Sequence, residues 1–344
     1  MRISSLGRNV DYVVSSCGRR KAVARPKVVI TGGAGFIGSH VADALVGEAD
    51  VVAIDHLKAG KRENLAKALK AGATLVKRDL LRGDLRPIFR KADVVYHFAA
   101  NPDVRLDRRG TKPTVDENIV ATHRVLEACR VAEVPRIVFA STSTVYGEAK
   151  VVPTPEDYSP LEPISVYGAS KLAGEALISA YAHTFGVQAF VFRLANVVGG
   201  RSGHGVVVDF VRKLTQDPKR LEILGSDPGT AKSYVHVDDV VAGMLAGQRG
   251  GSGPFSVYNV GSEDAITVRA LADAICAELG FRDVEYAWTG GAGGGRGWAG
   301  DVRAMRLALD RLERTGWRPR KTSAEAVRFA ARDAFSSMRK PRDA

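Results

Sequence analysis

The sequence predicts an α/β protein with a Rossmann-type, doubly wound parallel sheet and a smaller C-terminal lobe. From residue 27 onward, short Val- and Ile-rich runs alternate with segments of helix length, which indicates strand–helix–strand units with right-handed crossovers. The runs are apolar throughout, as expected for strands covered on both faces. A glycine-rich turn, residues 31–38 (TGGAGFIG), follows the first run and opens the first helical segment.

Seven apolar runs are the expected strands, in chain order residues 27–31, 51–55, 74–76, 93–97, 136–140, 188–193 and 256–260. Four helices are expected among them, at residues 37–47, 62–71, 118–132 and 165–185. After Asn196 the alternation weakens, and the chain becomes richer in Gly and Arg. Residues 289–300 are dense in glycine, which is typical of a flexible loop.

These patterns predict two structural units and two tails. The Rossmann domain is expected to comprise residues 26–196 together with about 233–264. A substrate-binding lobe, residues 197–232 plus 265–335, is expected over the carboxyl edge of the sheet, where open α/β sheets bind ligands. Residues 1–25 are expected to be a disordered basic tail, because their apolar stretch is too short for a secretion signal. Residues 336–344 are expected to be a second tail.

The composition is ordinary for a soluble globular protein, with 45% apolar and 26% charged residues in a chain of 344. No apolar run approaches the roughly 18 residues of a membrane-spanning helix. Three widely spaced cysteines argue against a disulfide framework and favour a cytoplasmic location. The net charge of +12 is interpreted as a solvated basic surface, since no nucleic-acid-binding motif accompanies it. We therefore expect no metal, no membrane and no nucleic-acid partner.

The glycine-rich turn predicts a dinucleotide site. Gly32 permits the tight turn, Gly35 lets backbone approach a pyrophosphate, and Gly38 allows the helix to pack on the strand. The helix that follows would present free N–H groups to the phosphates. Asp55 ends the second strand, 23 residues after Gly32. A carboxylate there accepts hydrogen bonds from the adenosine ribose and would repel a 2′-phosphate, so the spacing favours NAD over NADP.

A second motif, residues 167–171 (YGASK), predicts general-base chemistry. Tyr167 and Lys171 are four residues apart and share a helix face. A Lys ammonium beside a phenol stabilises the phenolate and lowers the Tyr pKa from its usual value of ~10. Thr142, just past the fifth strand, could hydrogen-bond a substrate oxygen, although Ser141 or Ser143 could be the acting hydroxyl instead.

Together these motifs resemble the extended short-chain dehydrogenases/reductases, and within them the NAD-dependent sugar-nucleotide epimerases and dehydratases. The resemblance runs from about Lys27 to about Ala330 and also rests on residues 97–101 (HFAAN) and 141–147 (STSTVYG). Members similar to UDP-glucose 4-epimerase are indicated by later segments, namely residues 196–199 (NVVG), 204–211 (HGVVVDFV), 232–239 (KSYVHVDD) and 296–301 (RGWAGD).

This resemblance implies an NAD site in which the glycine turn holds the pyrophosphate, Asp55 takes the ribose, and Asp79 and Leu80 flank the adenine. The implied cofactor residues are Gly32, Gly35, Phe36, Ile37, Gly38, Asp55, His56, Asp79, Leu80, Phe98, Ala99, Ala100, Tyr167, Lys171 and Leu194. It further implies catalytic roles for Thr142, Tyr167 and Lys171, and a homodimer assembled through the helices at 118–132 and 165–185.

A UDP-sugar site is implied as well, with substrate-binding residues Asn101, Thr142, Tyr167, Asn196, His204, Gly205, Val206, Lys232, Arg296 and Asp301. Lys232 stands where many relatives carry an Arg that contacts the diphosphate. Arg296 is near a second such Arg but not in register with it. Lys is a point charge where Arg would be a bidentate fork.

The absence of an acidic residue in the turn at 141–147 favours one reaction of this family over the others. In the resembling dehydratases and decarboxylases, an acidic residue stands two positions before the Tyr of the VYG turn. Here that position is Thr144, preceded by Ser143, so epimerisation at C4 of a UDP-hexose is favoured over dehydration. Arg105, Arg108 and Arg109 could reach a sugar carboxylate, which leaves a UDP-glucuronate 4-epimerase as the alternative, and after it another dehydratase or reductase of this family.

Overall fold

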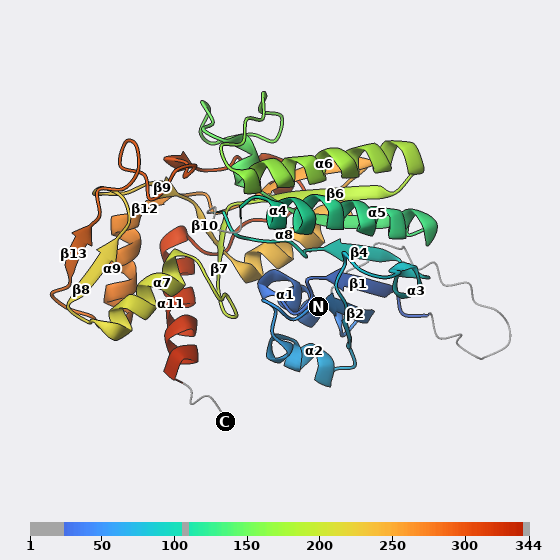
Figure 1. Cartoon of the computed structure of the whole chain (residues 1–344), viewed down its shortest axis with the longest axis horizontal. Coiled ribbons are helices and arrows are strands. Elements are labelled where there is room, and N and C mark those ends of the chain that lie inside the picture. Colours follow the sequence, from blue (N-terminus) through green and yellow to red (C-terminus); the bar gives the residue numbers. More distant parts are fainter. Residues whose placement is uncertain (1–23, 105–109, 340–344) are drawn as a thin grey trace.

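The computed structural model describes residues 24–104 and 110–339 (Figure 1). Its centre is a seven-stranded sheet of order β11-β6-β5-β4-β1-β2-β3, in which every neighbouring pair is parallel. The strands are β1 (Lys27–Thr31), β2 (Asp50–Asp55), β3 (Thr74–Lys77), β4 (Val94–His97), β5 (Arg136–Thr142), β6 (Gln188–Leu194) and β11 (Phe255–Val260). All seven predicted strands are present, and the predicted fold class is confirmed.

The sheet separates two apolar cores. Successive strand residues point to opposite faces, so Val28 and Ile30 lie in one core while Val29 lies in the other. Side chains of α1 (Phe36–Leu45), α2 (Ala66–Lys70) and α8 (Val237–Gly250) complete the first core. Those of α3 (Arg86–Phe89), α5 (Ala121–Val131) and α6 (Val166–Phe185) complete the second.

The strand order reverses at β1. The chain moves outward through β2 and β3 and then returns to β4 on the other side of β1. The carboxyl ends of β1 and β4 therefore frame the crevice in which ligands bind in open α/β sheets. Figure 1 shows the later segments gathered beyond this edge of the sheet.

Two predicted helices differ in detail from the structure. The segment at 62–71 divides into a 3₁₀ turn, η1 (Arg62–Leu65), and α2. The helix predicted at 118–132 begins earlier, because α4 (Lys112–Thr114) runs into a π-helical segment, η2 (Val115–Val120), before α5. Single π-helical turns are rare and often mark functional sites.

A third core holds the second lobe together, and it is formed mainly by α7 (Val206–Gln216), α9 (Val268–Leu279) and α11 (Ser323–Arg339). Short strands join these helices, namely β7 (Asn196–Val198) with β10 (Tyr234–His236), β8 (Arg220–Ile223) with β13 (Glu285–Trp288), and β9 (Ala231–Lys232) with β12 (Ile266–Thr267) and β14 (Ala304–Met305). A short helix, α10 (Asp310–Glu313), precedes α11.

The expected tails are only partly within the described residues. Arg25, expected in the N-terminal tail, instead donates hydrogen bonds to the carbonyl oxygens of Val46 and Ala49 after α1. At the other end, α11 continues to Arg339, past the expected end of the lobe. Residues 1–23 and 340–344 lie outside the described residues. None of the helices that are described combines the length and apolar character needed to cross a membrane.

Candidate active site

The glycine turn is pressed against the segment that follows β4. Gly32 has φ 67°, and a Cβ on it would lie 2.7 Å from the Ala99 nitrogen and 2.9 Å from the Phe98 carbonyl carbon. A Cβ on Gly38 would collide with the carbonyl oxygen of Gly32, so Gly38 serves the turn itself as well as the strand–helix contact. A Cβ on Gly35 would lie 3.1 Å from the Gly32 carbonyl oxygen, so this position is also tight.

The first turn of α1 is arranged to receive an anion. Gly35 precedes Phe36, Ile37 and Gly38 as the N-cap, and no side chain caps the helix. The first turn also contains no acidic residue. Backbone N–H groups at a helix N-terminus, together with the helix dipole, favour a phosphate there. The residues present therefore fit the pyrophosphate of a dinucleotide.

Asp55 is fixed at the carboxyl end of β2, beside the glycine turn. Its Oδ2 accepts a hydrogen bond from the Ala34 N–H at 3.1 Å, and its Oδ1 accepts one from the Leu57 N–H at 2.8 Å. His56 Nδ1 lies 3.6 Å from Asp55 Oδ1. The carboxylate is buried and held in place by backbone, as a ribose-binding group requires.

Three further predicted cofactor residues lie at or just after the carboxyl ends of β3 and β6. Asp79 accepts a hydrogen bond from the Leu81 N–H at 2.9 Å, which shapes the loop after β3. The Leu80 carbonyl accepts one from Arg124 Nε on α5 at 2.7 Å. Leu194, which is buried, ends β6.

Residues 98–100 continue from β4 across the glycine turn. The Phe98 N–H donates to the Thr31 carbonyl at 3.1 Å, and the Ala99 N–H donates to Thr31 Oγ1 at 3.3 Å. Ala100 follows directly, and the three residues are partly buried. This segment therefore forms one wall of the crevice, beside the glycine turn.

Asn118 links this wall to α6. The sequence analysis did not predict a role for this residue. Its Oδ1 accepts a hydrogen bond from the Asn101 N–H at 2.6 Å. Its Nδ2 donates to the Asn101 carbonyl at 3.2 Å and to Ser170 Oγ at 2.9 Å. Asn118 lies on η2, so the π-helical segment carries the side chain that joins the two motifs. A lone Asn in a helical stretch gives no sequence signal until these distant partners are known.

Tyr167 is positioned by the start of α6. Ser165 caps the helix, its Oγ accepting a hydrogen bond from the Gly168 N–H at 3.1 Å. A Cβ on Gly168 would lie 2.8 Å from the Thr144 carbonyl oxygen. This close approach brings the Tyr167 turn against the 3₁₀ turn η3 (Ser143–Tyr146), which follows β5.

Lys171 lies one helical turn further, on the face of α6 that packs on the sheet. It is buried, and its Nζ is 4.4 Å from the centre of the Phe139 ring on β5. A Cβ on Gly174 would lie 2.9 Å from Phe139 Cζ, so the glycine makes room for that ring. Tyr167 and Lys171 are therefore four residues apart on one helix, as predicted from the sequence. The Phe139 ring of β5 packs against Lys171 from the sheet.

The protonation of this pair is set by burial. Desolvation raises the pKa of Tyr167 to about 12, although its ring is partly exposed. Desolvation lowers the pKa of Lys171 to about 8, and the charge of Glu175 opposes that shift. Burial, and secondarily the Lys171 charge, lowers the pKa of His97 to about 3, so His97 is neutral at neutral pH.

The hydroxyl of Thr142 is available at the end of β5. Thr142 Oγ1 accepts hydrogen bonds from the Thr144 N–H and the Thr144 hydroxyl, both at 3.2 Å, and its own proton is left for another acceptor. Ser141 points to the opposite face of the strand and donates its hydroxyl to Glu175. This geometry favours Thr142 over Ser141 as the acting hydroxyl.

In the second lobe, Lys232 is paired with a carboxylate. Its ammonium forms an ion pair with Asp301 and lies 5.2 Å from the centre of the Trp298 ring. Asp301 is buried, and its Oδ2 accepts a hydrogen bond from the Gly297 N–H at 3.3 Å. Lys232 and Asp301, both predicted to bind substrate, thus form a single unit with the glycine-dense segment.

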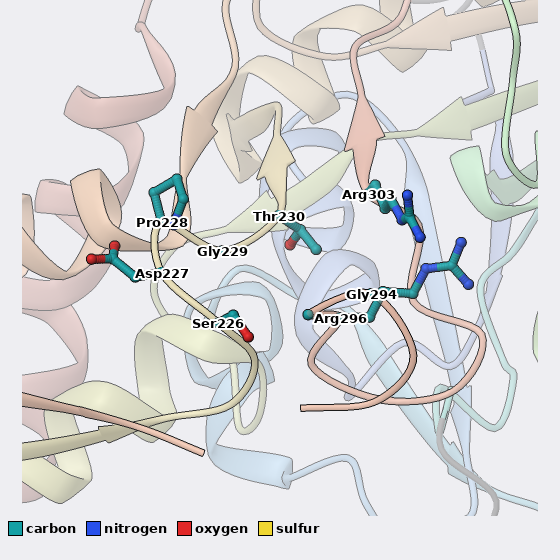
Figure 2. A pocket seen from close by; sticks show the side chains of 9 residues that line it. Ser226, Asp227, Pro228, Gly229, Thr230, Gly294, Arg296 and Arg303 are labelled. Carbon is teal, nitrogen blue, oxygen red and sulfur yellow. The ribbon is translucent and has the colours of Figure 1, made fainter. Parts of the chain in front are cut away.

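Arg296 is also held by a carboxylate, at 2.9 Å from Glu148. It lines a pocket of about 210 Å³ between residues 226–230 and 294–296, and Arg303 lines this pocket as well. Figure 2 shows the Arg296 and Arg303 side chains on the same side of this pocket. Two guanidinium groups so placed suit a phosphate-bearing ligand.

Asn196 and residues 204–206 complete the predicted substrate site. Asn196 Nδ2 donates to the Ser233 carbonyl at 3.2 Å. His204 and Gly205 are exposed, and Val206 begins α7. Gly205 has φ 101° and is the N-cap, with no side-chain cap, so this helix start is open to a ligand. In the described part of the chain, no group of His, Cys, Asp and Glu could hold a metal ion.

The chain is similar to known proteins over most of its length. The model of the NAD dependent epimerase/dehydratase family matches residues 28–261. The UDP-glucose 4-epimerase of Mycolicibacterium smegmatis is 34% identical over 313 residues, covering 88% of this chain and 96% of that protein. A crystal structure of a UDP-galactose 4-epimerase has 44% identity and a TM-score of 0.81, covering 91% of this chain and 99% of its own.

A second solved structure is similar and contains ligands. It is the UDP-glucuronic acid 4-epimerase from Bacillus cereus in complex with UDP-glucuronic acid and NAD. Its TM-score is 0.81 at 26% identity, and the match covers 90% of this chain and 99% of that one. The similarity therefore extends over both lobes.

Proposed function

The chain belongs to the NAD-dependent epimerase/dehydratase family, and from that premise we propose that it epimerises C4 of a UDP-hexose, interconverting UDP-glucose and UDP-galactose. The reaction would pass through a transient 4-keto sugar. The relatives that support this substrate are named UDP-glucose 4-epimerase and UDP-galactose 4-epimerase. The observation that carries the proposal is the set Thr142, Tyr167 and Lys171 without an acid at Thr144.

Each residue of this set has one task. Bound NAD supplies the hydride acceptor at C4 and the positive ring beside the phenol. Tyr167 takes the proton of the sugar 4-OH as general base, and Lys171 stabilises the phenolate. Thr142 donates a hydrogen bond to the sugar O4. Because burial alone keeps Tyr167 protonated, positive charge beside it is what brings its pKa toward neutral pH.

The turn after β5 supports epimerisation over dehydration. Thr144 donates its hydroxyl to Thr142, and the position before it is Ser143. Hydroxyls have very high pKa values and are poor acids for expelling the sugar 6-OH. A 4-keto sugar that turns over and takes hydride back on its other face needs no such acid.

UDP-glucuronate is the competing substrate. A solved relative of similar fold is a UDP-glucuronic acid 4-epimerase. The three arginines that could meet its carboxylate, Arg105, Arg108 and Arg109, lie outside the described residues. The alternative is therefore supported by this relative and by the sequence of the arginine segment.

A homodimer through α5 and α6 is part of the proposal. Val120, Val131 and Phe185 are 42%, 48% and 49% exposed on or beside these helices. Such apolar side chains on neighbouring helices suit a self-complementary C₂ interface. Light scattering at micromolar concentration should report a dimer, and a monomer would count against this interface.

The function is tested by feeding the protein UDP-glucose, UDP-galactose and UDP-glucuronate separately with NAD and weighing the products. Epimerisation gives an isomer of unchanged mass and altered chromatographic mobility. A product lighter by one water would identify a dehydratase, and loss of carbon dioxide a decarboxylase. Turnover of UDP-glucuronate alone would replace the UDP-hexose as substrate.

A further inference from the structure

A buried ion pair lies one helical turn beyond Lys171 on α6. The side chains of Glu175 on α6 and Arg193 on β6 are 5% and 6% exposed. Arg193 donates from Nε to both carboxylate oxygens, at 3.1 and 3.2 Å, and from a terminal nitrogen at 2.7 Å. The pair is therefore bidentate and almost fully removed from water.

This ion pair is fixed from three further sides. Ser141 on β5 donates its hydroxyl to Glu175. Arg193 also donates to the Tyr146 hydroxyl at 3.0 Å and to the Glu156 carbonyl at 2.9 Å. Ser141 and Arg193 each immediately precede a site residue at the end of their strand, Thr142 and Leu194 respectively. The network thus joins the strand ends, the turn after β5 and α6.

Stability alone does not account for such a pair. A buried ion pair often adds nothing to stability compared with apolar side chains of equal volume. The next turn of α6 offers another reason for it, since Glu175 is four residues after Lys171 and on the same buried face.

The surroundings of Lys171 are otherwise poor in negative charge. Tyr167 lies one turn before it on α6, the Phe139 ring contacts its Nζ from β5, and its charge acts on neutral His97 of β4. Burial lowers the pKa of Lys171 to about 8, and the Glu175 carboxylate opposes this shift. Without that carboxylate, the ammonium would lose its proton more readily.

We propose that Glu175 is a positioning residue: clamped by Arg193, it holds a negative charge one helical turn from Lys171 and keeps that side chain charged and fixed beside Tyr167. This deepens the proposed function, because it rests on Lys171 and Tyr167 acting as the base pair of the reaction. Arg193 acts through Glu175 and touches neither substrate nor cofactor in this account.

The proposal is tested by NMR titration of isotope-labelled lysine side chains in the NAD-loaded protein. The Lys171 signal is assigned by its loss in Lys171→Arg. Glu175→Gln keeps the shape of the side chain and removes its charge, and it should lower the titration midpoint of Lys171 by about 1 pH unit. An unchanged midpoint in a folded variant would overturn the proposal.

Asp239→Asn is the matched control. Asp239 is a buried carboxylate that binds a guanidinium, that of Arg320 at 2.9 Å, but it lies on α8, away from Lys171. It should leave the Lys171 midpoint unchanged even if it lowers thermal stability. A shift of equal size in this variant would show a general effect of destabilisation and contradict the proposal.

If Glu175→Gln fails to fold with Arg193 unpaired, the double variant Glu175→Gln/Arg193→Gln replaces it. The midpoint should then fall by less than in Glu175→Gln, because a positive charge is removed together with the negative one. No fall at all would overturn the proposal.

The alkaline limb of kcat in Glu175→Gln should move with the NMR midpoint, with little change in KM. Absence of turnover in the unmodified protein would reject the proposed function, while the NMR midpoint would still decide this inference.

Discussion

In the half of the site built on the sheet edge, the polar groups are fixed by backbone and neutral side chains: Asp55 by two N–H groups, and the wall at residues 98–101 by Thr31 and Asn118. In the half built on the second lobe, two cations are held by carboxylates instead, Lys232 by Asp301 and Arg296 by Glu148. The polar groups of the first half are held by the protein itself. Under the proposed function, the two cations of the second half would exchange their ion pairs for contacts with the substrate phosphates.

This difference indicates which part of the site would determine the choice of cofactor and which part would determine the affinity for the diphosphate. Cofactor choice follows from fixed geometry, which a sequence motif can encode. Under the proposed function, diphosphate affinity would depend on a balance between two sets of ionic contacts, whose partners lie far apart in the chain. Substitutions in the first half should therefore strongly reduce turnover or cofactor binding. Substitutions in the second half should change KM for the UDP-sugar by smaller factors, in either direction.

The largest effect is expected at Tyr167. Tyr167→Phe removes the only ionisable oxygen of the general base and keeps the shape of the ring, so turnover should fall by at least about 100-fold. Steady-state kinetics with unchanged thermal unfolding is the check. Near-normal turnover in this variant would remove Tyr167 from the mechanism.

The next largest effect is expected at Asp55. Asp55→Ala should weaken NAD binding by about 10-fold or more and relax discrimination against NADP, because the carboxylate that would repel a 2′-phosphate is gone. Calorimetric binding of both cofactors measures this, with the exposed Asp84→Ala as control. If NADP gains nothing relative to NAD, Asp55 does not lie at the ribose.

A smaller effect is expected at Lys232. Lys232→Met combined with Asp301→Asn removes the cation without leaving a bare buried carboxylate, and it should raise KM for the UDP-sugar by about 10-fold, the scale of a charged hydrogen bond. NAD affinity should stay the same. An unchanged KM would show that Lys232 serves only the ion pair with Asp301.

The smallest effect, and one of opposite sign, is expected at Glu148. Glu148→Gln releases Arg296 from its ion pair, so KM should fall by about 3-fold at low salt, and the difference should fade as salt is added. A rise in KM would mean that Glu148 positions Arg296 for the substrate rather than competing with the substrate for it.

The sequence predicted the sheet closely because its strands are buried on both faces and read as continuous apolar runs. It also predicted the glycine turn, Asp55 and the Tyr167–Lys171 spacing, since each depends on local geometry. It did not reveal Asn118 or the Glu175–Arg193 pair, whose partners are brought together only by the fold. The pairing of Lys232 with Asp301, 69 residues away, was hidden for the same reason.

The role of Gly38 was predicted only in part. Its spacing predicted close packing of helix and strand, and the structure adds a contact with the carbonyl of Gly32 that spacing cannot show. The short strands of the second lobe were not predicted, because segments of two to four residues with mixed polarity give no clear periodicity.

The central claim is that C4 gives up its hydrogen and takes the same hydrogen back. Supplying UDP-glucose with deuterium at C4 and analysing the product by mass spectrometry and NMR tests this most directly. We expect UDP-galactose of unchanged mass with the deuterium still at C4, and with no net consumption of NAD. A product that has lost water, or has exchanged the C4 label with solvent, would contradict the account.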